Sequence, residues 1–548
     1  MHGLKRFSTF SPFVFAVRLA LVFFTLQAVA AQGAATVVYV SPEGDESGPG
    51  TMEKPFRTIG RAVANLTADT HTVEITGGVY GEEDGESFPI HIPVGPGQRV
   101  ILRGPASGKA IIRGRADAVV IAATILEGQL ASPSEISMES LAFDNGLTGI
   151  AVDGQSRVDL TMRVRNCVFT DQKYQGLSAS VGDQGTAAFI VDGNVFDGRP
   201  LYSLDLVVGR RASMQVQVEG NTIENTDPVG SSSTPPRAGI ALHAEEGGRI
   251  QGFVDRNTIR NVSNGILVTQ MPLKKEEAKV DLRISNCLVA GNPSPTSNHL
   301  ENGFYFVLWP INENRLQLIN NTVAHARGHG VLRAGGSSPG ANWDPTTLSL
   351  VRSILWDVAR GGFSDEQGAG LPSFYTEIRN NILPGGALVG SAGNISVDPL
   401  WGPRFEPGRE SPAVDADAGA IPQEFVFDLM GKCRVADGND DGVARIDLGA
   451  IERVGPCSGA VVFLRGDCDS SGALDLTDAV HHLNYLFLGG LEPQCPDACD
   501  ANDDGVVDIA DPIYCLGFMF TGGKAPAFPY PAWGEDPTED RLPRCSGL

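Results

Sequence analysis

Oxygen-bearing side chains recur at fixed positions in two twelve-residue segments near the C-terminus, which begin at Asp467 and Asp500, 33 residues apart. In both, an oxygen ligand falls at positions 1, 3, 5, 9 and 12, glycine makes the turn at position 6, and position 7 offers its backbone carbonyl. A hard cation that needs six to eight oxygens binds such a pattern. The sequence therefore predicts two Ca²⁺ sites, with the ligands Asp467, Asp469, Ser471, Ala473, Asp475 and Asp478 in the first and Asp500, Asn502, Asp504, Val506, Asp508 and Asp511 in the second.

A helical apolar pattern follows each loop, whereas none precedes it, so the repeated unit is a loop followed by a helix. Each predicted helix stops at a Gly-Gly pair, at Gly489–Gly490 and at Gly522–Gly523. Because helices this short do not persist alone in water, we expect their stripes to pack together. The stripes comprise Val480, Leu483, Leu486 and Phe487 in the first helix and Ile513, Leu516, Met519 and Phe520 in the second.

The duplicated loop-helix unit over residues 463–523 resembles a type I dockerin domain, whose fold is a small α-helical EF-hand-like module. The resemblance implies binding to a cohesin-like protein. At loop positions 10 and 11, however, many dockerins carry a Ser-Thr-like pair for that purpose. Here Leu476–Thr477 and Ile509–Ala510 stand instead, which counts against a cohesin-like partner.

A third acidic segment begins like the other two, with Asp437, Asn439 and Asp441 at positions 1, 3 and 5. It then offers Arg445 at position 9 and Leu448 at position 12, neither of which supplies a carboxylate. We interpret it as a turn, with a third, weaker cation site as the alternative.

The middle of the chain, residues 139–395, repeats an alternating strand, a turn containing Asn, a small apolar cluster, and then Gly with a second apolar strand. Alternation with a period of two, as in Val158–Val164, predicts strands, whereas a helical solenoid would need apolar residues three and four apart. The repeat therefore predicts a mainly β fold, a parallel β-solenoid whose coils bury their inward side chains by stacking. We assign the turn residues, which can hydrogen-bond from rung to rung, as Asn166, Asn194, Asn221, Asn257, Asn286, Asn321, Ser353 and Asn381.

Segments on both sides of the repeat resemble known families. The N-terminal motifs resemble the start of secreted, pectate-lyase-like right-handed parallel β-helix proteins, which carry a domain of unknown function at their head. The later motifs resemble the closing segment, of choice-of-anchor type, that follows bacterial β-helices. The resemblances imply work on extracellular polysaccharide, and they rest on Tyr39–Asp45, Lys54–Ile59, Gly78–Tyr80 and Val100–Gly104 at one end and on Asp398–Trp401, Ser411–Asp415 and Asp447–Glu452 at the other.

Composition and termini predict a secreted protein. Lys5 and Arg6 precede an apolar stretch that ends in Ala28-Val29-Ala30, which is typical of a cleaved signal peptide, and no later segment is long enough to span a membrane. The net charge of −23 and the lack of a basic stripe argue against nucleic acid as a partner. The nine cysteines fit extracellular disulfides, and the plausible pairs, among other connectivities, are Cys433–Cys457, Cys468–Cys499 and Cys495–Cys545.

These patterns divide the chain into six segments. They are a signal peptide (1–31), an N-terminal cap with the first coils (37–112), β-helix repeats (113–395), a closing segment (396–457), a dockerin-like calcium module (463–523) and a Pro-rich tail (524–548).

Two hypotheses of function remain open. In the first, a polysaccharide lyase or glycoside hydrolase has its site on the β-helix near loops 227–236 and 291–300. A lyase would need converging carboxylates and a Lys or Arg base, and Asp153, Asp192, Asp197 and Asp205 are scattered over successive rungs. In the second, the β-helix is a non-catalytic adhesive surface that binds glycan or protein, attached through the calcium module. No catalytic residue is assigned, and we expect His481 and His482 to lie on the helix surface.

Overall fold

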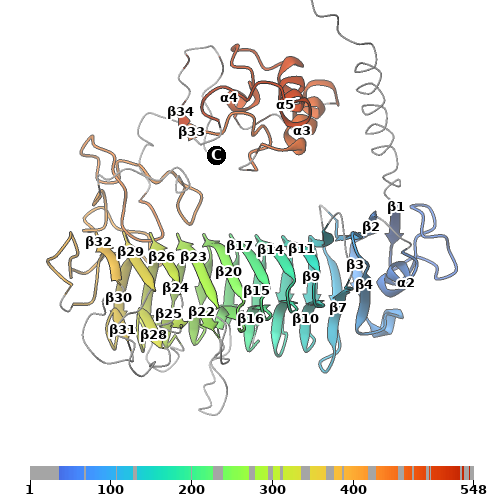
Figure 1. Cartoon of the computed structure of the whole chain (residues 1–548), viewed down its shortest axis with the longest axis horizontal. Coiled ribbons are helices and arrows are strands. Elements are labelled where there is room, and N and C mark those ends of the chain that lie inside the picture. The colour runs from blue at the N-terminus through green and yellow to red at the C-terminus, as the bar shows by residue number, and fades with distance from the viewer. Residues whose placement is uncertain are drawn as a thin grey trace, which may run out of the picture.

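Three parallel β-sheets wind into one right-handed β-helix, as Figure 1 shows. The computed structural model describes residues 36–66, 70–105, 108–127, 133–198, 200–225, 238–270, 278–293, 300–308, 313–334, 346–365, 375–385, 388–417, 427–453, 462–471, 474–488, 493, 495–530, 534–535, 538 and 542. The predicted signal peptide, loop 227–236 and Ala473 lie outside these residues. The predicted mainly β, right-handed parallel β-helix is confirmed.

Each coil between the two ends contributes one strand to each sheet, and neighbouring strands within a sheet are parallel. Sheet A comprises β1 (Thr36–Val40), β2 (Thr70–Ile75), β5 (Arg99–Arg103), β8 (Ser134–Glu139), β11 (Asp159–Arg165), β14 (Thr186–Asp192), β17 (Ser213–Glu219), β20 (Arg249–Asp255), β23 (Lys279–Ser285), β26 (Arg315–Ile319), β29 (Thr347–Val351) and β32 (Tyr375–Arg379). Sheet B comprises β3 (Gly78–Tyr80), β6 (Ala110–Arg113), β9 (Leu141–Asp144), β12 (Val168–Thr170), β15 (Val195–Gly198), β18 (Thr222–Asn225), β21 (Thr258–Arg260), β24 (Leu288–Ala290), β27 (Thr322–Ala326) and β30 (Ile354–Val358). Sheet C comprises β4 (Ile90–Val94), β7 (Val119–Ile125), β10 (Thr148–Gly154), β13 (Gln175–Val181), β16 (Tyr202–Val208), β19 (Ala238–Ala244), β22 (Asn264–Gln270), β25 (Asn302–Val307), β28 (Val331–Ala334) and β31 (Phe363–Asp365).

A buried polar ladder runs along the turn between sheets A and B. The side-chain oxygen of Asn221 accepts hydrogen bonds from the backbone and side-chain nitrogens of Asn194, at 3.0 and 2.9 Å. Asn257 does the same for Asn221 on the next rung. The predicted rung-to-rung role of asparagine is therefore confirmed, and it satisfies backbone groups that the coil buries.

On two rungs, the predicted ladder position is wrong by one residue. Cys167 and Cys287 occupy the ladder positions, and their backbone nitrogens donate to Asn194 and Asn321. Asn166 and Asn286 precede them in the left-handed conformation, with φ values of 53° and 51°. Asparagine tolerates that conformation, so the Asn-Cys pair offered two placements from sequence.

The inside of the coil is filled by side chains that repeat from rung to rung. Phe143, Phe169 and Phe196 stack from sheet B with ring centroids 5.0 and 4.6 Å apart. The glycine near the start of β10, β13, β19, β22 and β25 permits this packing: a Cβ on Gly176 would lie 2.5 Å from Phe196 Cδ1 and 2.8 Å from Ser203 O. At the N-terminal end, α2 (Ile59–Ala64) packs against β1, β2 and β4, and the short helix η1 (Glu82–Asp84) follows β3.

The segment after the last coil lies along the side of the solenoid. Phe405 and Ile451 pack against Leu288 and Ala324, which belong to β24 and β27 of sheet B. Arg434, 1% exposed, bonds Glu452 at 3.0 Å and, back on the solenoid, Asn286 at 2.6 Å. Residues 396–417 and 427–453 therefore form an additional wall over sheet B.

Three helices and a two-stranded sheet make up the C-terminal module. The helices are α3 (Leu476–Leu488), α4 (Pro496–Cys499) and α5 (Ala510–Thr521), and β33 (Val462–Phe463) pairs antiparallel with β34 (Gly534–Glu535). Helices α3 and α5 contact each other, and Gly522 ends α5 at a φ of 71°. Among the described residues, no helix combines the length and apolar character needed to cross a membrane.

The predicted packing of the two apolar stripes is wrong for four of their residues. Val480 and Phe487 on α3, with Ile513 and Phe520 on α5, are 49–66% exposed. The buried face of α3 carries Ala479 and His482 instead. His482 was predicted at the surface and is 1% exposed.

Candidate functional site

A histidine on the outer side of sheet C lies between a carboxylate and a hydroxyl. His243 Nε2 is 3.3 Å from Asp205 Oδ1, and His243 Nδ1 is 2.6 Å from Thr269 Oγ1. The three residues come from β16, β19 and β22, which are neighbours in the sheet. A hydrogen-bonded imidazole paired with a carboxylate is suited to accept and return a proton.

Strand alternation and register bring these side chains together. Leu204 and Leu206 point into the coil, so Asp205 between them points out, and His243 lies in the same way between Leu242 and Ala244. His243 pairs with Thr269 in register, while Asp205 pairs with Ala241, two residues before His243. Asp205 therefore reaches His243 diagonally across the rungs, within reach of a longer side chain.

Further groups orient this cluster. Gln175 Nε2 donates to Asp205 Oδ2 at 3.2 Å, and Thr148 Oγ1 donates to Gln175 Oε1 at 2.9 Å. Tyr202 meets the His243 ring edge to face, with centroids 6.1 Å apart. Burial, with a contribution from the charge of Asp205, raises the pKa of Tyr202 above its usual value of 10.0, so its phenol stays protonated at neutral pH.

The four aspartates singled out in the sequence do not converge. Asp153 and Asp205 lie on sheet C, whereas Asp192 ends β14 of sheet A and Asp197 lies in β15 of sheet B. Asp153 and Asp205 are two rungs and two residues apart, which puts their Cα atoms roughly 12 Å from each other. Asp153 accepts a hydrogen bond from Ser180 Oγ at 2.9 Å, whereas Asp205 lies beside His243, so the two carboxylates have separate partners.

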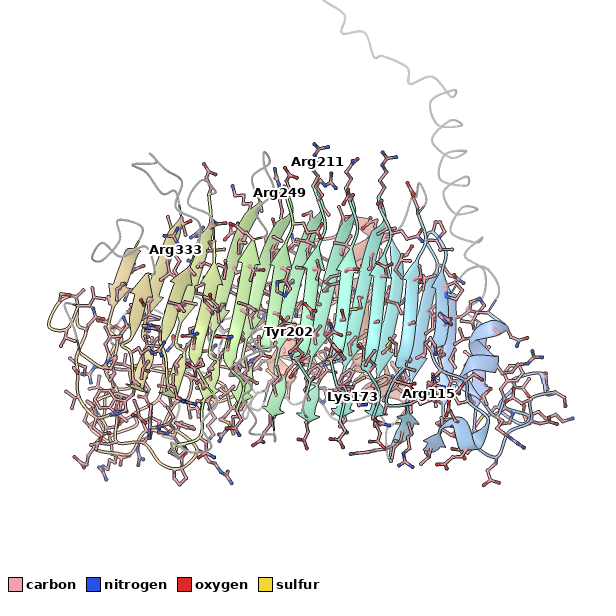
Figure 2. The ribbon with its side chains drawn as sticks, turned by 90° about the horizontal axis from the view of Figure 1, so that it is seen from below. Arg115, Lys173, Tyr202, Arg211, Arg249 and Arg333 are labelled. Atoms are coloured by element: carbon pink, nitrogen blue, oxygen red, sulfur yellow. A yellow bond between two sulfur atoms is a disulfide. The ribbon has the colours of Figure 1, made fainter. Side chains whose placement is uncertain are left out.

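The expected Lys or Arg base is missing from this part of the sheet. The six strands β10, β13, β16, β19, β22 and β25 contain neither residue type. In Figure 2, Tyr202 lies in the middle of the solenoid, while Lys173, Arg115, Arg211 and Arg249 lie nearer its edges. His243 is the base that this face offers, and the sequence reasoning missed it because a lone histidine in a strand gives no motif.

Three carboxylates predicted as calcium ligands come together in the first loop. Carboxylate oxygens of Asp467, Asp469 and Asp478 all lie within 4.8 Å of one another. Asp478 Oδ1 and Oδ2 accept hydrogen bonds from the backbone nitrogens of Asp469 and Asp475, at 3.1 and 2.7 Å. Burial raises the pKa of Asp478 to about 8, and the neighbouring carboxylates of Asp469 and Asp467 act in the same direction.

The second loop repeats this arrangement. Asp511 accepts from the backbone nitrogens of Asn502 at 3.5 Å and Asp508 at 2.9 Å, which matches the contacts of Asp478. Asp500 accepts from the backbone nitrogens of Asp504 at 3.1 Å and Gly505 at 2.7 Å. Burial raises the pKa of Asp511 to about 7, with the charge of Asp500 adding to the effect.

The third acidic segment shares the first half of this geometry. Asp437 accepts from the backbone nitrogens of Asp441 at 3.0 Å and Gly442 at 2.8 Å, as Asp500 does. In its second half, Arg445 Nη1 lies 3.5 Å from Asp441 Oδ2. A guanidinium thus neutralises a carboxylate that would otherwise face the cation, which favours the interpretation as a turn.

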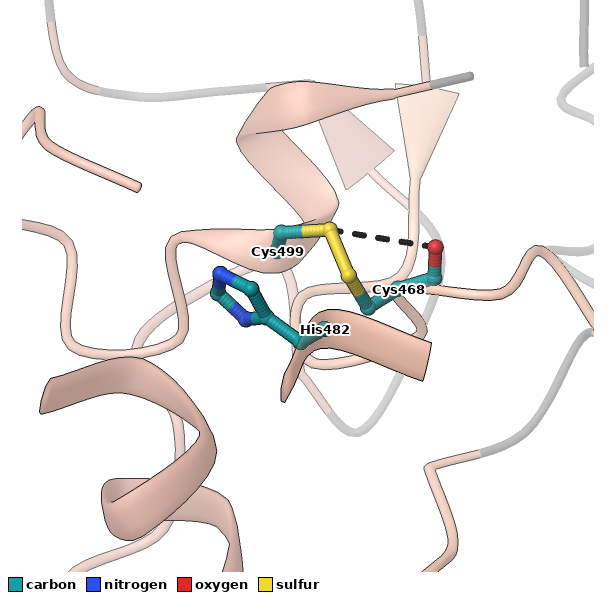
Figure 3. Close-up of side chains that lie close together, drawn as sticks. All are labelled: Cys468, His482 and Cys499. Atoms are coloured by element: carbon teal, nitrogen blue, oxygen red, sulfur yellow. Dashed lines mark hydrogen bonds between the residues drawn. A yellow bond between two sulfur atoms is a disulfide. The ribbon is translucent and has the colours of Figure 1, made fainter. Parts of the chain in front are cut away.

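A disulfide joins the two loop-helix units, as Figure 3 shows. It links Cys468 in the first loop to Cys499, which directly precedes the second, and this predicted pair is confirmed. His482 lies beside it, but the two sulfurs are bonded to each other and are not thiolate ligands. Cys433 and Cys495 are also disulfide-bonded, and their predicted partners Cys457 and Cys545 lie outside the described residues.

Exposed apolar side chains on the module repeat with the same spacing of 33 residues as the loops. All are 49–66% exposed, and they come from α3, from α5 and from the end of the second loop. The matched pairs are Leu476 with Ile509, Val480 with Ile513, and Phe487 with Phe520.

Comparisons with known proteins match the solenoid. A family described as "Protein of unknown function (DUF1565)" matches residues 42–270, less than half of the chain. No curated protein matches the chain in sequence.

Solved structures of similar shape include several polysaccharide lyases. The chain is similar to a pectate lyase, with 15% identity, a TM-score of 0.42, and coverage of 77% of this chain and 98% of that one. It is also similar to a rhamnogalacturonan lyase (13% identity, TM-score 0.28, 63% and 87% covered) and to an alginate lyase (12% identity, TM-score 0.33, 68% and 55% covered). These likenesses concern the fold alone.

Proposed function

We propose that this protein is a secreted, polysaccharide-active β-helix protein whose glycan lies across the outer face of sheet C. The observation that carries the proposal is the cluster beside Tyr202, in which Thr269 hydrogen-bonds His243 and Asp205 lies 3.3 Å from the other ring nitrogen. An aromatic ring next to polar groups of fixed orientation suits a sugar, whose faces are apolar and whose rim carries hydroxyl groups.

The chemistry that this group supports is proton transfer. His243 is the base, Asp205 orients it, and the protonated phenol of Tyr202 is the acid. In a lyase reaction, the base removes the proton α to a uronate carboxyl group and the leaving sugar oxygen receives a proton. Since these strands carry no Lys or Arg, the face suits an esterified polyuronide, which keeps the carbonyl group next to the transferred proton, better than a free polyuronide.

The second candidate is a non-catalytic adhesive that binds the same glycan. It is favoured by the separate partners of Asp153 and Asp205, which do not form a carboxylate pair, and by the lack of Lys or Arg in the six strands of this face. Both candidates use the same face, so one set of variants separates them.

The test is binding and product formation on a panel of neutral, esterified and acidic polysaccharides, with His243→Ala, Asp205→Asn and Tyr202→Phe. For an enzyme, we expect His243→Ala to lower the rate of formation of unsaturated ends by at least about 100-fold, while binding changes less than about 10-fold. Product from the wild type that is unaffected in all three variants would place the catalytic site elsewhere. Binding without product, weakened by Tyr202→Phe and His243→Ala, would establish the adhesive.

We further propose that the module at 463–523 binds two Ca²⁺ ions and attaches the protein through its exposed apolar face. The donor sets fit a hard cation, since only oxygen ligands occur and their negative charges have few counter-charges within each loop. The 33-residue repeat of exposed apolar residues supports a docking face for a protein such as a cohesin-like partner.

Calcium removal has a localised expected effect. With chelator, hydrogen exchange should accelerate in α3 and α5, because the loop carboxylates then repel each other, while the strands of the β-helix should keep their protection. The measurement is hydrogen exchange by mass spectrometry on the full chain, with Asp500→Ala as a variant of one loop and Asp153→Ala as the control. Exchange in α3 and α5 that is the same with and without calcium would contradict the calcium proposal.

A further inference from the structure

A cleft lies between sheet B and the closing segment, away from the sheet C cluster. Its volume is about 410 Å³, which suits one or two sugar rings or a ligand of similar size. One wall comes from the sheet B rungs, with Glu224, Arg260 and His325, and the other comes from the closing segment, with Trp401 and Phe405. Nothing in the sheet C cluster contributes to it.

The cleft holds its polar groups in place before any ligand binds. The guanidinium carbon of Arg260 lies 5.4 Å from the centroid of the Phe405 ring, and Trp401 packs edge to face on the same ring at 5.2 Å. His325 Nδ1 is 2.6 Å from Asp357 Oδ2, which lies on the next rung. A side chain immobilised in this way loses little conformational entropy on binding.

Asn261 adds a further polar residue to the cleft. Asn261 follows Arg260 directly and also lines the cleft. It adopts the left-handed conformation, with a φ of 56°, as do His325 and Asp357 at the same turn of later rungs. Consecutive residues of the chain therefore both face the cleft, which a regular strand does not allow.

The charges indicate which ligand fits. Glu224 and Arg260 are direct partners in the register of β18 and β21, so the cleft presents one carboxylate next to one guanidinium. A phosphate, sulfate or free uronate would meet Glu224 as a like charge. A neutral sugar can donate hydrogen bonds from its hydroxyl groups to Glu224 and accept hydrogen bonds from Arg260 and Asn261. Its apolar face can pack on Trp401.

We propose that this cleft is a second glycan site, independent of the sheet C face, which binds one or two neutral pyranose units. It shares rungs with the first site but uses a different sheet and the closing segment. The closing segment thus does more than cover sheet B, because it supplies the aromatic wall of the site.

The test is calorimetric titration of the full chain with four neutral disaccharides: cellobiose, xylobiose, mannobiose and maltose. Glu224→Gln removes the carboxylate charge and keeps the shape of the side chain, and Arg260→Met removes the guanidinium and keeps an unbranched apolar stem. For the disaccharide that binds, we expect each variant to weaken affinity at least about 10-fold. Trp401→Ala is the less specific variant, because Trp401 also packs against the solenoid.

His243→Ala and Tyr202→Phe are the matched controls, and we expect them to leave this binding unchanged. Failure of the sheet C proposal and failure of the cleft proposal therefore give different results. The cleft proposal is overturned if no disaccharide binds at concentrations on the order of 10 mM, or if Glu224→Gln and Arg260→Met bind as the wild type does. Tighter binding of digalacturonate than of any neutral disaccharide would also overturn it.

Discussion

At the scale of single residues, the buried asparagine side chains of the ladder hydrogen-bond backbone groups of neighbouring rungs and one another. Asn221, 1% exposed, accepts from Asn194 and donates to Val191 O and to Asn257. Each rung therefore relies on the side chain of the next one. The same residue type on the outer surface of a strand would have water as its partner and would contribute little.

Replacing Asn221 by alanine should lower the free energy of unfolding by about 2–4 kcal/mol, because it leaves buried donors and acceptors without partners. Gln215→Ala is the matched control, since this amide lies on the same coil but is exposed, and it should change stability by less than about 0.5 kcal/mol. The measurement is denaturant unfolding followed by circular dichroism. Equal effects of the two substitutions would show that the ladder is not a source of stability.

Residue types also explain what the sequence could reveal about the candidate site. Asp205 was singled out as an acidic residue, but its partner His243 stands 38 positions later, beyond loop 226–237. Loop length changes from rung to rung, so the sequence does not state which outward residues become neighbours. The calcium sites could be proposed from the sequence because all expected ligands of one ion fall within twelve consecutive positions.

At the scale of elements, the closing segment is held on the solenoid by a buried polar cluster. Asp447, 1% exposed, accepts from the backbone nitrogens of Asp415 and Arg453, both at 2.7 Å. Burial raises its pKa to about 6, with the charge of Asp415 acting in the same direction. Burial likewise raises the pKa of Glu452, in spite of its ion pair with Arg434.

These shifts predict that the closing segment is more stable at mildly acidic pH. Because the pKa of Asp447 is higher in the folded chain, about 6, than its model value of 3.8, the folded state binds a proton more tightly between these values. The stabilisation is fully present below pH 3.8 and is lost as the pH rises through 6, by about 3 kcal/mol in all. Hydrogen exchange of residues 427–453, corrected for intrinsic rates, should be slower at pH 5 than at pH 7.5.

Asp447→Asn is the control, and it should reduce that pH dependence. Protection of the segment that is equal at the two pH values, or greater at pH 7.5, would contradict the expectation.

The strands and helices also show what hydrophobic periodicity can and cannot predict. The period of two predicted the strands, because inward residues alternate regardless of which rung covers them. The helical stripes of α3 and α5 were found by the same reasoning, yet Val480, Phe487, Ile513 and Phe520 are exposed. An apolar stripe shows which face avoids water, and it does not show whether the neighbouring helix or a separate protein covers that face.

At the scale of the whole molecule, the two proposed glycan sites occupy overlapping rungs on different sheets. The sheet C cluster spans β16 to β22, and the cleft receives residues from β18, β21 and β27. The rigid stacking of the coils fixes the distance between the sites, so neither has to be ordered when the other is occupied. A long polysaccharide that contacts both sites gains from the high effective concentration of its second part.

The arrangement predicts that polymers bind more tightly than the short units of which they are built. We expect the affinity for a soluble polymer to exceed that for its disaccharide by on the order of 100-fold, since the second contact is intramolecular. Arg260→Met and Tyr202→Phe should each remove most of this advantage, and the double variant should bind the polymer no better than a single site does. The measurement is affinity electrophoresis against the polymer beside calorimetry with the disaccharide, on the same four proteins. A polymer advantage that survives in both single variants would mean that the two faces do not share one chain, and each site would then act alone.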